Sequence, residues 1–306
     1  MRALFLCIGD TIAAGALKGW LDAGHEVAEI WHAPHQGLRR SQRTLNRFAP
    51  DWSVYRLAQR HAVPMFCNPL LRKWTGALQR IDDIRADVLI TAVTMQIVPP
   101  AIIDRFGGRA ANFHPALLPH FRGPSPYLGQ LLDERENEYG GMTLHQLAPG
   151  IDEGPIIGAI AVPFDSVGRD YRAWRIATAF AGRRLAREVL PEFFAGRIEA
   201  VPQGPGSYRR VPECKIGLAS SYADVERVIE KVGYTGRVMA EGKSVRAVSA
   251  DLGPPTGKRP NISALHVELD IADRRVRLRR CGPIERLTWR LDQLSAIRNL
   301  ERQAQL

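Results

Sequence analysis

Residues 2–31, RALFLCIGDTIAAGALKGWLDAGHEVAEIW, decide the fold of this 306-residue chain. Arg2 to Gly9 is a short apolar run that predicts a β-strand, and Thr11 to Ala23 then carries apolar side chains at helical spacing before Gly24. His25 to Trp31 predicts a second strand. A strand, a helix and a second strand in this order predict two parallel strands joined by a right-handed crossover.

The same alternation continues along the chain. Val63 to Phe66 predicts a third strand, and Leu70 to Ile84 predicts a helix, after a predicted loop from His32 to Pro50. Asp87 to Thr94, DVLITAVT, is a nearly continuous apolar run rich in branched residues, as expected of a central strand covered on both faces. We therefore predict an α/β fold with a Rossmann-like, doubly wound and mostly parallel sheet. Ligands of such sheets bind beyond the carboxyl ends of the strands, where Met95 to Pro100 falls.

The last third of the chain has a different pattern. A long amphipathic helix is predicted from Tyr171 to Phe194, followed by a Pro- and Gly-rich linker. Arg237 to Ser249 resembles a hairpin, and His266 to Arg280 alternates as two more strands before a charged helix from Ile284 to Gln303. The predicted limits are 1–195 for a first domain, 196–207 for a linker and 208–306 for a small β-rich C-terminal domain. The last helix is either a solvated cap or a contact with another subunit, and no oligomeric state is predicted.

Composition excludes several classes of protein. The hydrophobic content of 45% and the charged content of 24% are typical of an ordinary globular protein. The longest later apolar run, Val88 to Ile103, is broken by polar residues and prolines and is shorter than the ~20 residues of a membrane helix. The four cysteines are far apart and form no CxxC pair, so we expect neither a zinc site nor a disulfide framework, and a cytoplasmic location.

The net charge of +10 is concentrated in two places. The last 100 residues hold 19 Lys and Arg against 12 Asp and Glu, which indicates either a surface that faces nucleic acid or a solvated arginine-rich surface. The predicted loop from His32 to Pro50 carries Arg39, Arg40, Arg43 and Arg47. These arginines either steer anions to a site or are solvated.

Known nucleotide motifs are missing from the chain. The turn after the first predicted strand, GDTIAAG, does not place its glycines as a dinucleotide fingerprint requires, and no GxxxxGK[ST] occurs. We therefore expect no nicotinamide or flavin cofactor.

The segment from 111 to 129, ANFHPALLPHFRGPSPYLG, predicts a functional site. Asn112 and His114 lie two residues apart at the end of a predicted strand, so their side chains point to the same face of the sheet. Pro115 and Pro119 then make the connection stiff. Further along, Asp152 lies in the loop APGIDEGP, where flanking glycines allow a sharp turn or a close approach to a ligand.

Together, NFHPALLPHFRG and GGMTLHQLAPGIDEGPI resemble the signature of formyltransferases that use 10-formyltetrahydrofolate. This family includes methionyl-tRNA formyltransferase, glycinamide ribonucleotide transformylase, sugar-nucleotide N-formyltransferases and formyltetrahydrofolate deformylase. The resemblance covers about the first two thirds of the chain. It implies that a folate is the formyl donor and that an amine is the acceptor, with no metal involved.

The resemblance also implies a set of site residues. By motif position, the catalytic residues would be Asn112, His114 and Asp152. The folate would bind along Met95, Gln96, Ile97, Val98, Leu118, Gly150 and Ile151, largely through backbone groups.

The residue types suit formyl transfer to an amine. When the amine attacks the formyl carbon, the oxygen gains negative charge, and an Asn amide and a protonated His can donate hydrogen bonds to it. The attacking nitrogen must also lose a proton, which a carboxylate can accept while its charge holds the imidazole protonated.

The acceptor stays open at this point. Transfer-RNA formyltransferases typically have Ser in the apolar turn and Ala-Ala-Pro after Arg-Gly, whereas this chain has Ala116 and GPSPY over residues 123–127. That sequence is more similar to relatives acting on small amines such as an aminosugar nucleotide. The basic tail, which by resemblance would be a barrel that helps to hold RNA, favours methionyl-tRNA equally. Two further hypotheses are a hydrolase that releases formate and a non-catalytic tRNA-binding relative.

Overall fold

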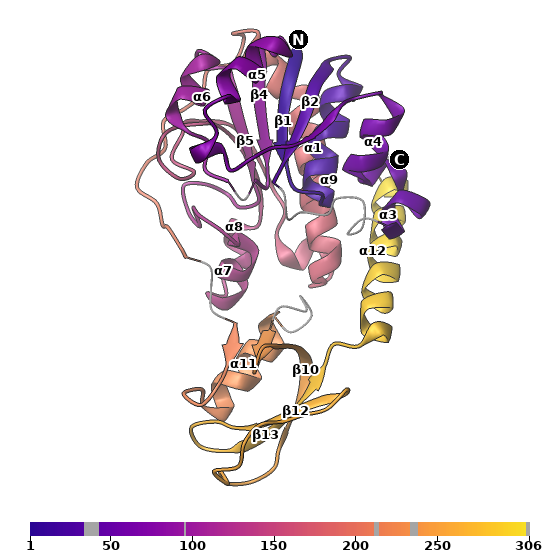
Figure 1. Cartoon of the computed structure of the whole chain (residues 1–306), viewed down its shortest axis with the longest axis vertical. Helices are drawn as coiled ribbons and strands as arrows, with labels where there is room; N and C mark the ends of the chain where they lie inside the picture. The colour runs from indigo at the N-terminus through magenta and orange to yellow at the C-terminus, as the bar shows by residue number, and fades with distance from the viewer. Residues whose placement is uncertain (34–42, 95, 211–213, 233–237, 304–306) are drawn as a thin grey trace.

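The computed structural model describes residues 1–33, 43–94, 96–210, 214–232 and 238–303, which form two sheets with helices around them (Figure 1). The strands of the first sheet are β1 (Arg2–Cys7), β2 (Glu26–His32), β3 (Met65–Cys67), β4 (Val88–Ala92), β5 (Ala110–His114), β6 (Gly141–Gln146) and β7 (Ile156–Ala161). Their order is β3-β2-β1-β4-β5-β6-β7. Strands β1 to β5 pair in parallel and β6 is antiparallel to both of its neighbours, which confirms the predicted mostly parallel sheet.

Helices cover both faces of this sheet. One apolar core contains side chains of α1 (Thr11–Asp22), α4 (Val54–Arg60) and α9 (Tyr171–Glu188), and the other contains those of α5 (Ala77–Asp83) and α6 (Pro100–Arg105). The remaining helices of this part are α3 (Arg43–Phe48), α7 (Pro126–Leu132), α8 (Glu136–Tyr139) and α10 (Leu190–Phe194). This two-sided covering explains why the central strands are apolar along their whole length.

Three sequence predictions differ from the structure. The helix predicted from Leu70 to Ile84 is interrupted, because Trp74 leaves the helical conformation and its ring lies 4.8 Å from the ring of Trp31. A short 3-10 helix, Leu71–Lys73, precedes Trp74, and α5 follows it. The helix predicted from Tyr171 to Phe194 is divided into α9 and α10, because Pro191 cannot donate the next helical hydrogen bond.

The third difference concerns the loop predicted from His32 to Pro50. Its last part forms α3, whose Leu45 is buried in the core. Arg43 and Arg47 therefore belong to a helix, whereas Arg39 and Arg40 lie outside the described residues. A single buried leucine in a short helical turn is too weak a pattern to predict from periodicity.

Helices α1 and α9 pack closely because glycines line α1. An added Cβ at Gly19 would lie 2.2 Å from the backbone oxygen of Arg183 in α9. The two backbones can approach to this distance only because no side chain separates them.

Gly19→Ala should therefore lower the free energy of unfolding by about 1–3 kcal/mol, since one helix must shift and the core is overpacked. Alanine also stabilises a helix by ~1 kcal/mol relative to glycine, so the variant is less stable only if the cost of overpacking is larger than this gain. Gly182→Ala in α9 is the matched control, because the nearest atom to its added Cβ would be the Met142 methyl at 3.4 Å, an ordinary van der Waals contact with a side chain. Urea denaturation should show Gly182→Ala to be neutral or stabilising; equal stability of the two variants would contradict this packing argument.

The second sheet is built from β8 (Lys215–Ile216), β9 (Val238–Ala240), β10 (Lys243–Asp251), β11 (Asn261–Ile262), β12 (His266–Asp270) and β13 (Arg275–Arg280). Their order is β11-β12-β13-β10-β9-β8, and α11 (Tyr222–Val232) packs against this sheet through its buried face. The hairpin predicted around Glu241-Gly242 is confirmed as β9 and β10, and the two strands predicted between His266 and Arg280 are β12 and β13. The β-rich second part of the fold is therefore confirmed.

The last helix, α12 (Pro283–Gln303), leaves the second sheet and returns to the first part of the chain (Figure 1). The Trp289 ring lies 6.0 Å from the Tyr171 ring of α9, and Trp52 Nε1 donates a 2.8 Å hydrogen bond to Glu301. Because α12 follows the second sheet in sequence but packs on the first part, the limits 1–195, 196–207 and 208–306 stay a prediction. Within the described ranges, no helix is long and apolar enough to cross a bilayer.

Candidate active site

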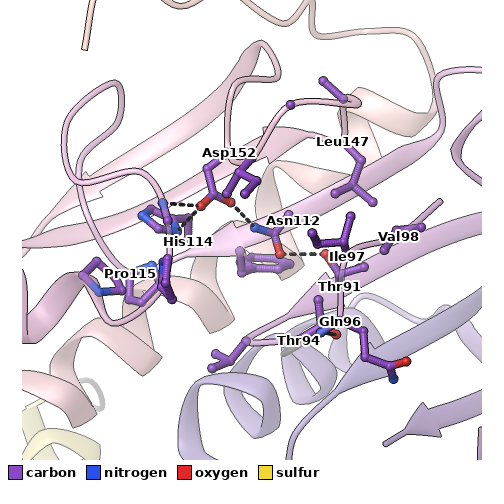
Figure 2. A pocket seen from close by; sticks show the side chains of 18 of the residues that line it. Thr91, Thr94, Gln96, Ile97, Val98, Asn112, His114, Pro115, Leu147 and Asp152 are labelled. Atoms are coloured by element: carbon purple, nitrogen blue, oxygen red, sulfur yellow. Dashed lines mark hydrogen bonds and ion pairs between the residues drawn. The ribbon is translucent and has the colours of Figure 1, made fainter. Parts of the chain in front are cut away.

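The structure brings the three predicted catalytic side chains together at the carboxyl end of β5 (Figure 2). Asn112 and His114 lie on one face of β5, while Phe113 between them is buried in the core on the other face. Asp152, from the loop between β6 and β7, lies against both: its Oδ1 is 3.3 Å from Asn112 Nδ2, and its Oδ2 is 3.4 Å from His114 Nδ1. Residues 40 positions apart in sequence thus form one polar cluster.

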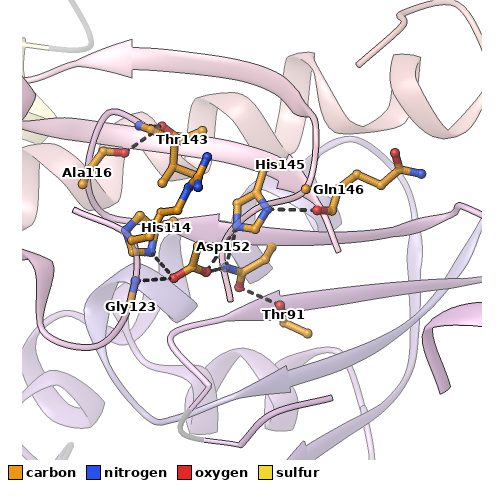
Figure 3. A network of polar contacts seen from close by, with 12 residues as sticks. Thr91, His114, Ala116, Gly123, Thr143, His145, Gln146 and Asp152 are labelled. Atoms are coloured by element: carbon orange, nitrogen blue, oxygen red, sulfur yellow. Dashed lines mark hydrogen bonds and ion pairs between the residues drawn. The ribbon is translucent and has the colours of Figure 1, made fainter. Parts of the chain in front are cut away.

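Two buried neighbours fix the orientation of the Asn112 amide (Figure 3). Thr91 Oγ1 on β4 donates a 2.6 Å hydrogen bond to Asn112 Oδ1. His145 Nε2 on β6 lies 3.0 Å from Asn112 Nδ2, and His145 Nδ1 lies 2.9 Å from the carbonyl oxygen of Gln146. That carbonyl can only accept, so it holds the proton on His145 Nδ1 and leaves Nε2 to accept from Asn112. One amide hydrogen of Asn112 is therefore engaged by His145, and the other makes the longer bond to Asp152, in which a bound carbonyl could replace Asp152 as the acceptor.

His145 and Thr91 were missed by the sequence analysis. His145 alternates with the buried Met142 and Leu144 on β6, so its side chain lies on the opposite face from theirs, and it pairs in register with Asn112. The alternation in MTLHQL carries this signal, but only the antiparallel register of β5 and β6 shows which residue His145 meets.

His114 is held in one tautomer. Its Nε2 donates a 2.9 Å hydrogen bond to the carbonyl oxygen of Phe121, which leaves Nδ1 as the nitrogen that faces Asp152. Burial lowers the pKa of His114, and the nearby Asp152 charge offsets this only in part. The imidazole is thus neutral at rest, which differs from the protonated His114 expected from the sequence.

Asp152 is an ionised carboxylate in a strained backbone position. Burial acts to raise its pKa, but the positive charge that His114 gains at acid pH and the Gly123 N–H, which donates a 2.9 Å hydrogen bond, together hold the pKa well below its usual range. Its φ of +53° lies in the left-handed region, which costs ~1–3 kcal/mol for a residue other than glycine. The surrounding structure must therefore hold this loop in place.

A cavity of about 350 Å³ opens in front of the three side chains. Of the residues predicted to bind folate, Gln96, Ile97, Val98, Gly150 and Ile151 line it. Leu118 is not among the described lining residues; it is buried, and its N–H donates to Thr143. Met95 lies outside the described residues. Within the described parts of the chain, no group of three or more His, Cys, Asp or Glu side chains could hold a metal ion.

The cavity is bordered by apolar side chains that water can reach. Ile97 is 68% exposed and Ile151 is 43% exposed, and both line the cavity. Exposed isoleucines beside a polar cluster favour a ligand with an apolar, ring-like part and a reactive end that reaches Asn112, His114 and Asp152.

Comparison with known proteins identifies the class. Residues 71–179 match the family model described as Formyl transferase, and this range contains β4 to β7 and all three clustered side chains. This part of the chain therefore matches the formyl transferase family, and the resemblance predicted from the motifs is confirmed.

Two relatives in this class are methionyl-tRNA formyltransferases. The chain is 31% identical over 209 residues to the methionyl-tRNA formyltransferase of Streptococcus sanguinis, covering 67% of this chain and 63% of that protein. It is 29% identical over 255 residues to the methionyl-tRNA formyltransferase of Heliobacterium modesticaldum, covering 81% and 72%. The chain spans only 51–63% of the length of the first two curated relatives that it matches.

A solved structure shares the fold over nearly the whole chain. The N-formyltransferase from Helicobacter canadensis, in complex with folinic acid and dTDP-3-aminofucose, superposes with a TM-score of 0.54 and covers 92% of this chain and 100% of that one. At 14% identity this similarity shows the fold alone.

Proposed function

We propose that this protein transfers a formyl group from 10-formyltetrahydrofolate to a primary amine. The observation that carries the proposal is the cluster of Asn112, His114 and Asp152, which lies within hydrogen-bonding reach at the wall of one cavity and inside the part of the chain that matches the formyl transferase family. The cavity borders suit a folate, whose ring system would lie against the exposed isoleucines. The Helicobacter canadensis relative was solved with folinic acid, which supports a folate donor here.

Asn112 would stabilise the oxygen of the formyl group. As the amine attacks, negative charge develops on this oxygen, and a fixed N–H that points at it lowers the barrier. The Asn112 amide is oriented for this role by Thr91 and His145, so it loses little freedom in the transition state. Its hydrogen bond to Asp152 is the one that the formyl oxygen would replace.

His114 and Asp152 would accept the proton that the attacking nitrogen loses. In the resting pair, the Asp152 carboxylate is ionised and the His114 imidazole is neutral. The nitrogen that can take up a proton is His114 Nδ1. A proton placed there forms an ion pair with Asp152, so the pair is a better base than a buried imidazole alone. The resulting positive charge also lies near the developing oxyanion. As the tetrahedral intermediate collapses, the bond between the formyl carbon and the folate nitrogen would break, and His114 would give the proton to that nitrogen as tetrahydrofolate leaves.

This arrangement predicts how turnover depends on pH. The pKa of His114 is lowered in the folded protein, so the base is neutral above this lowered value and becomes protonated as the pH falls through it. We expect kcat at saturating substrates to be constant around neutral pH and to fall only on the acid side, below the usual histidine value of ~6.5. A kcat profile measured in a constant-ionic-strength buffer series checks this; a kcat that rises as the pH drops below 6 would indicate that a protonated His114 is required instead.

The acceptor is proposed as either methionyl-tRNA or an aminosugar nucleotide. Methionyl-tRNA is supported by the names of the relatives, whose alignment reaches 81% of this chain, and the sugar nucleotide by the Helicobacter canadensis complex. In this structure Pro124, Ser125 and Tyr208 line the cavity beside Asp152, so this wall is where an acceptor would approach.

The function is tested by mixing the full chain with 10-formyltetrahydrofolate and one acceptor at a time. The acceptors are initiator methionyl-tRNA, dTDP- and UDP-linked aminosugars, and buffer alone. Formation of tetrahydrofolate together with a formylated product supports the proposal and names the acceptor. Tetrahydrofolate and formate released in buffer alone would show a hydrolase, and tRNA binding without turnover would show a non-catalytic relative.

A further inference from the structure

We propose that Gln203 is a positioning residue for Asp152, and that residues 201–209, here called the crossing segment, are part of the active site. This inference rests on the proposed function. Most of this stretch belongs to the linker predicted from the sequence. In the structure it contacts both the loop of Asp152 and the loop of Phe121, whose carbonyl binds His114.

Gln203 holds the backbone on both sides of the Asp152 carboxylate. Its Nε2 donates hydrogen bonds to the carbonyl oxygen of Asp152 at 2.9 Å and to that of Gly154 at 2.6 Å. Both amide hydrogens are thus used on one loop. This is the loop in which Asp152 has a left-handed backbone conformation, so the contacts act where the backbone needs support.

Arg122 holds Gln203 in turn. Its Nε and Nη2 donate to Gln203 Oε1 at 3.1 and 2.8 Å, and its Nη2 also lies 3.3 Å from the carbonyl oxygen of Gly204. The acceptor and both donors of the Gln203 amide are therefore engaged, which fixes the way the amide faces. Arg122 is next to Gly123, whose N–H donates to the Asp152 carboxylate. Arg122 and Gln203 therefore connect the loop that binds this carboxylate to the loop that carries it.

The crossing segment also supports the carbonyl that binds His114. Phe121, whose oxygen accepts from His114 Nε2, donates its own N–H to Ser207 Oγ at 3.0 Å. Arg122 N–H donates to the Ser207 carbonyl at 2.9 Å. At Gly206 an added Cβ would lie 2.0 Å from the carbonyl oxygen of Pro119, so the segment lies against this loop without a side chain between them. The Phe121 carbonyl, which holds His114, and the Asp152 loop are thus both held by the crossing segment.

The geometry separates an effect on chemistry from an effect on folate binding. Gln203 is not among the described residues that line the cavity. Its loss should let the Asp152 loop relax and carry the carboxylate away from His114 Nδ1, while Gln96, Ile97 and Val98, which line the cavity from another part of the chain, keep their places. Displacements of about 1 Å at a reacting group can cost ~100-fold in rate.

The test compares Gln203→Leu and Gln203→Glu with the wild-type full chain. Leucine removes all the contacts, whereas glutamate keeps the length and the bond to Arg122 but cannot donate to two carbonyls. We expect kcat to fall ~10–100-fold in both, with KM for 10-formyltetrahydrofolate changed by less than ~3-fold. The fall of kcat on the acid side of its pH profile, here called the acid limb, should also move to lower pH. The reason is that His114 loses the nearby Asp152 charge that favours its protonated form. Gln59→Leu, on the exposed face of α4, is the matched control.

A second measurement does not depend on turnover. Hydrogen exchange of the amides of residues 150–154 should be faster in Gln203→Leu than in wild type or Gln59→Leu. If the wild type transfers no formyl group, the proposed function fails, but faster exchange in this loop would still support the positioning role. The inference would be overturned if both Gln203 variants had the wild-type kcat and the wild-type exchange rate at residues 150–154. A lower kcat whose pH profile keeps the wild-type acid limb would overturn it as well. Should Gln203→Leu not fold, Gln203→Glu and Arg122→Met carry the same expectations.

Discussion

Asp152→Asn should lower kcat by at least ~100-fold while the chain stays folded. The substitution keeps the shape of the side chain and can still accept from Gly123 N–H, but it removes the negative charge beside His114. Without that charge, the lowered pKa of the buried His114 falls further, so the imidazole no longer holds the proton that the attacking amine must lose. Steady-state tetrahydrofolate release at saturating donor measures the effect.

The matched control for this carboxylate is Asp165→Asn. Asp165 has 58% of its side chain exposed and pairs with Arg169 at the surface. It should keep the wild-type rate. An Asp152→Asn enzyme as fast as this control would show that the proton acceptor lies elsewhere.

The low pKa of Asp152 also links this residue to stability. Its folded-state pKa lies below the unfolded value of ~3.9, so the carboxylate stabilises the fold above that pH and loses this contribution as the pH falls through the folded-state value. His114, whose pKa is lowered as well, acts in the same direction below ~6.5. Both groups therefore favour the folded state at neutral pH over acid pH.

His114→Ala should also lower kcat by at least ~100-fold, because the nitrogen that takes the proton is removed and Asp152 loses the imidazole beside it. The substitution leaves the Phe121 carbonyl unpaired in a buried place, which costs ~1–3 kcal/mol of stability. His114→Gln is the sharper variant, since its amide can still donate to Phe121 but cannot titrate. We expect it to be as inactive as His114→Ala.

Circular dichroism and thermal unfolding would confirm that both His114 variants are folded. His61→Ala, at an exposed position after α4, is the control and should keep the wild-type rate. Activity within a few-fold of this control in either His114 variant would show that the site has been misplaced.

Much of the fold follows from local sequence patterns. The apolar runs at Arg2 to Gly9 and Asp87 to Thr94 predict strands that the structure contains, because a strand buried on both faces tolerates few polar residues. The errors occur where tertiary contacts override local preference. Trp74 interrupts a predicted helix and packs its ring against Trp31 at a tilt, and α12 returns to α9 through contacts such as Trp289 with Tyr171. Pairings of this kind depend on distances across the fold and leave no periodic signal.

The candidate site likewise contains residues that can be predicted from local sequence and residues that cannot. Asn112, His114 and Asp152 stand out in sequence because polar residues at a strand end and between glycines are characteristic of sites. His145 and Gln203 do not stand out, although both contact this cluster. His145 meets Asn112 only through the register of β5 and β6, and Gln203 reaches the Asp152 loop from 51 residues further along the chain. Their contribution is visible only once the chain is folded.

The most direct test is transfer from 10-formyltetrahydrofolate labelled with ¹³C at the formyl carbon. Wild type and Asp152→Asn would each be mixed with initiator methionyl-tRNA and with aminosugar nucleotides, and the products read by mass spectrometry. We expect a labelled formyl group on one class of amine, formed in equal amount to tetrahydrofolate and reduced at least ~100-fold by Asp152→Asn. Absence of label on every amine, with the donor left intact by the folded wild-type protein, would contradict it.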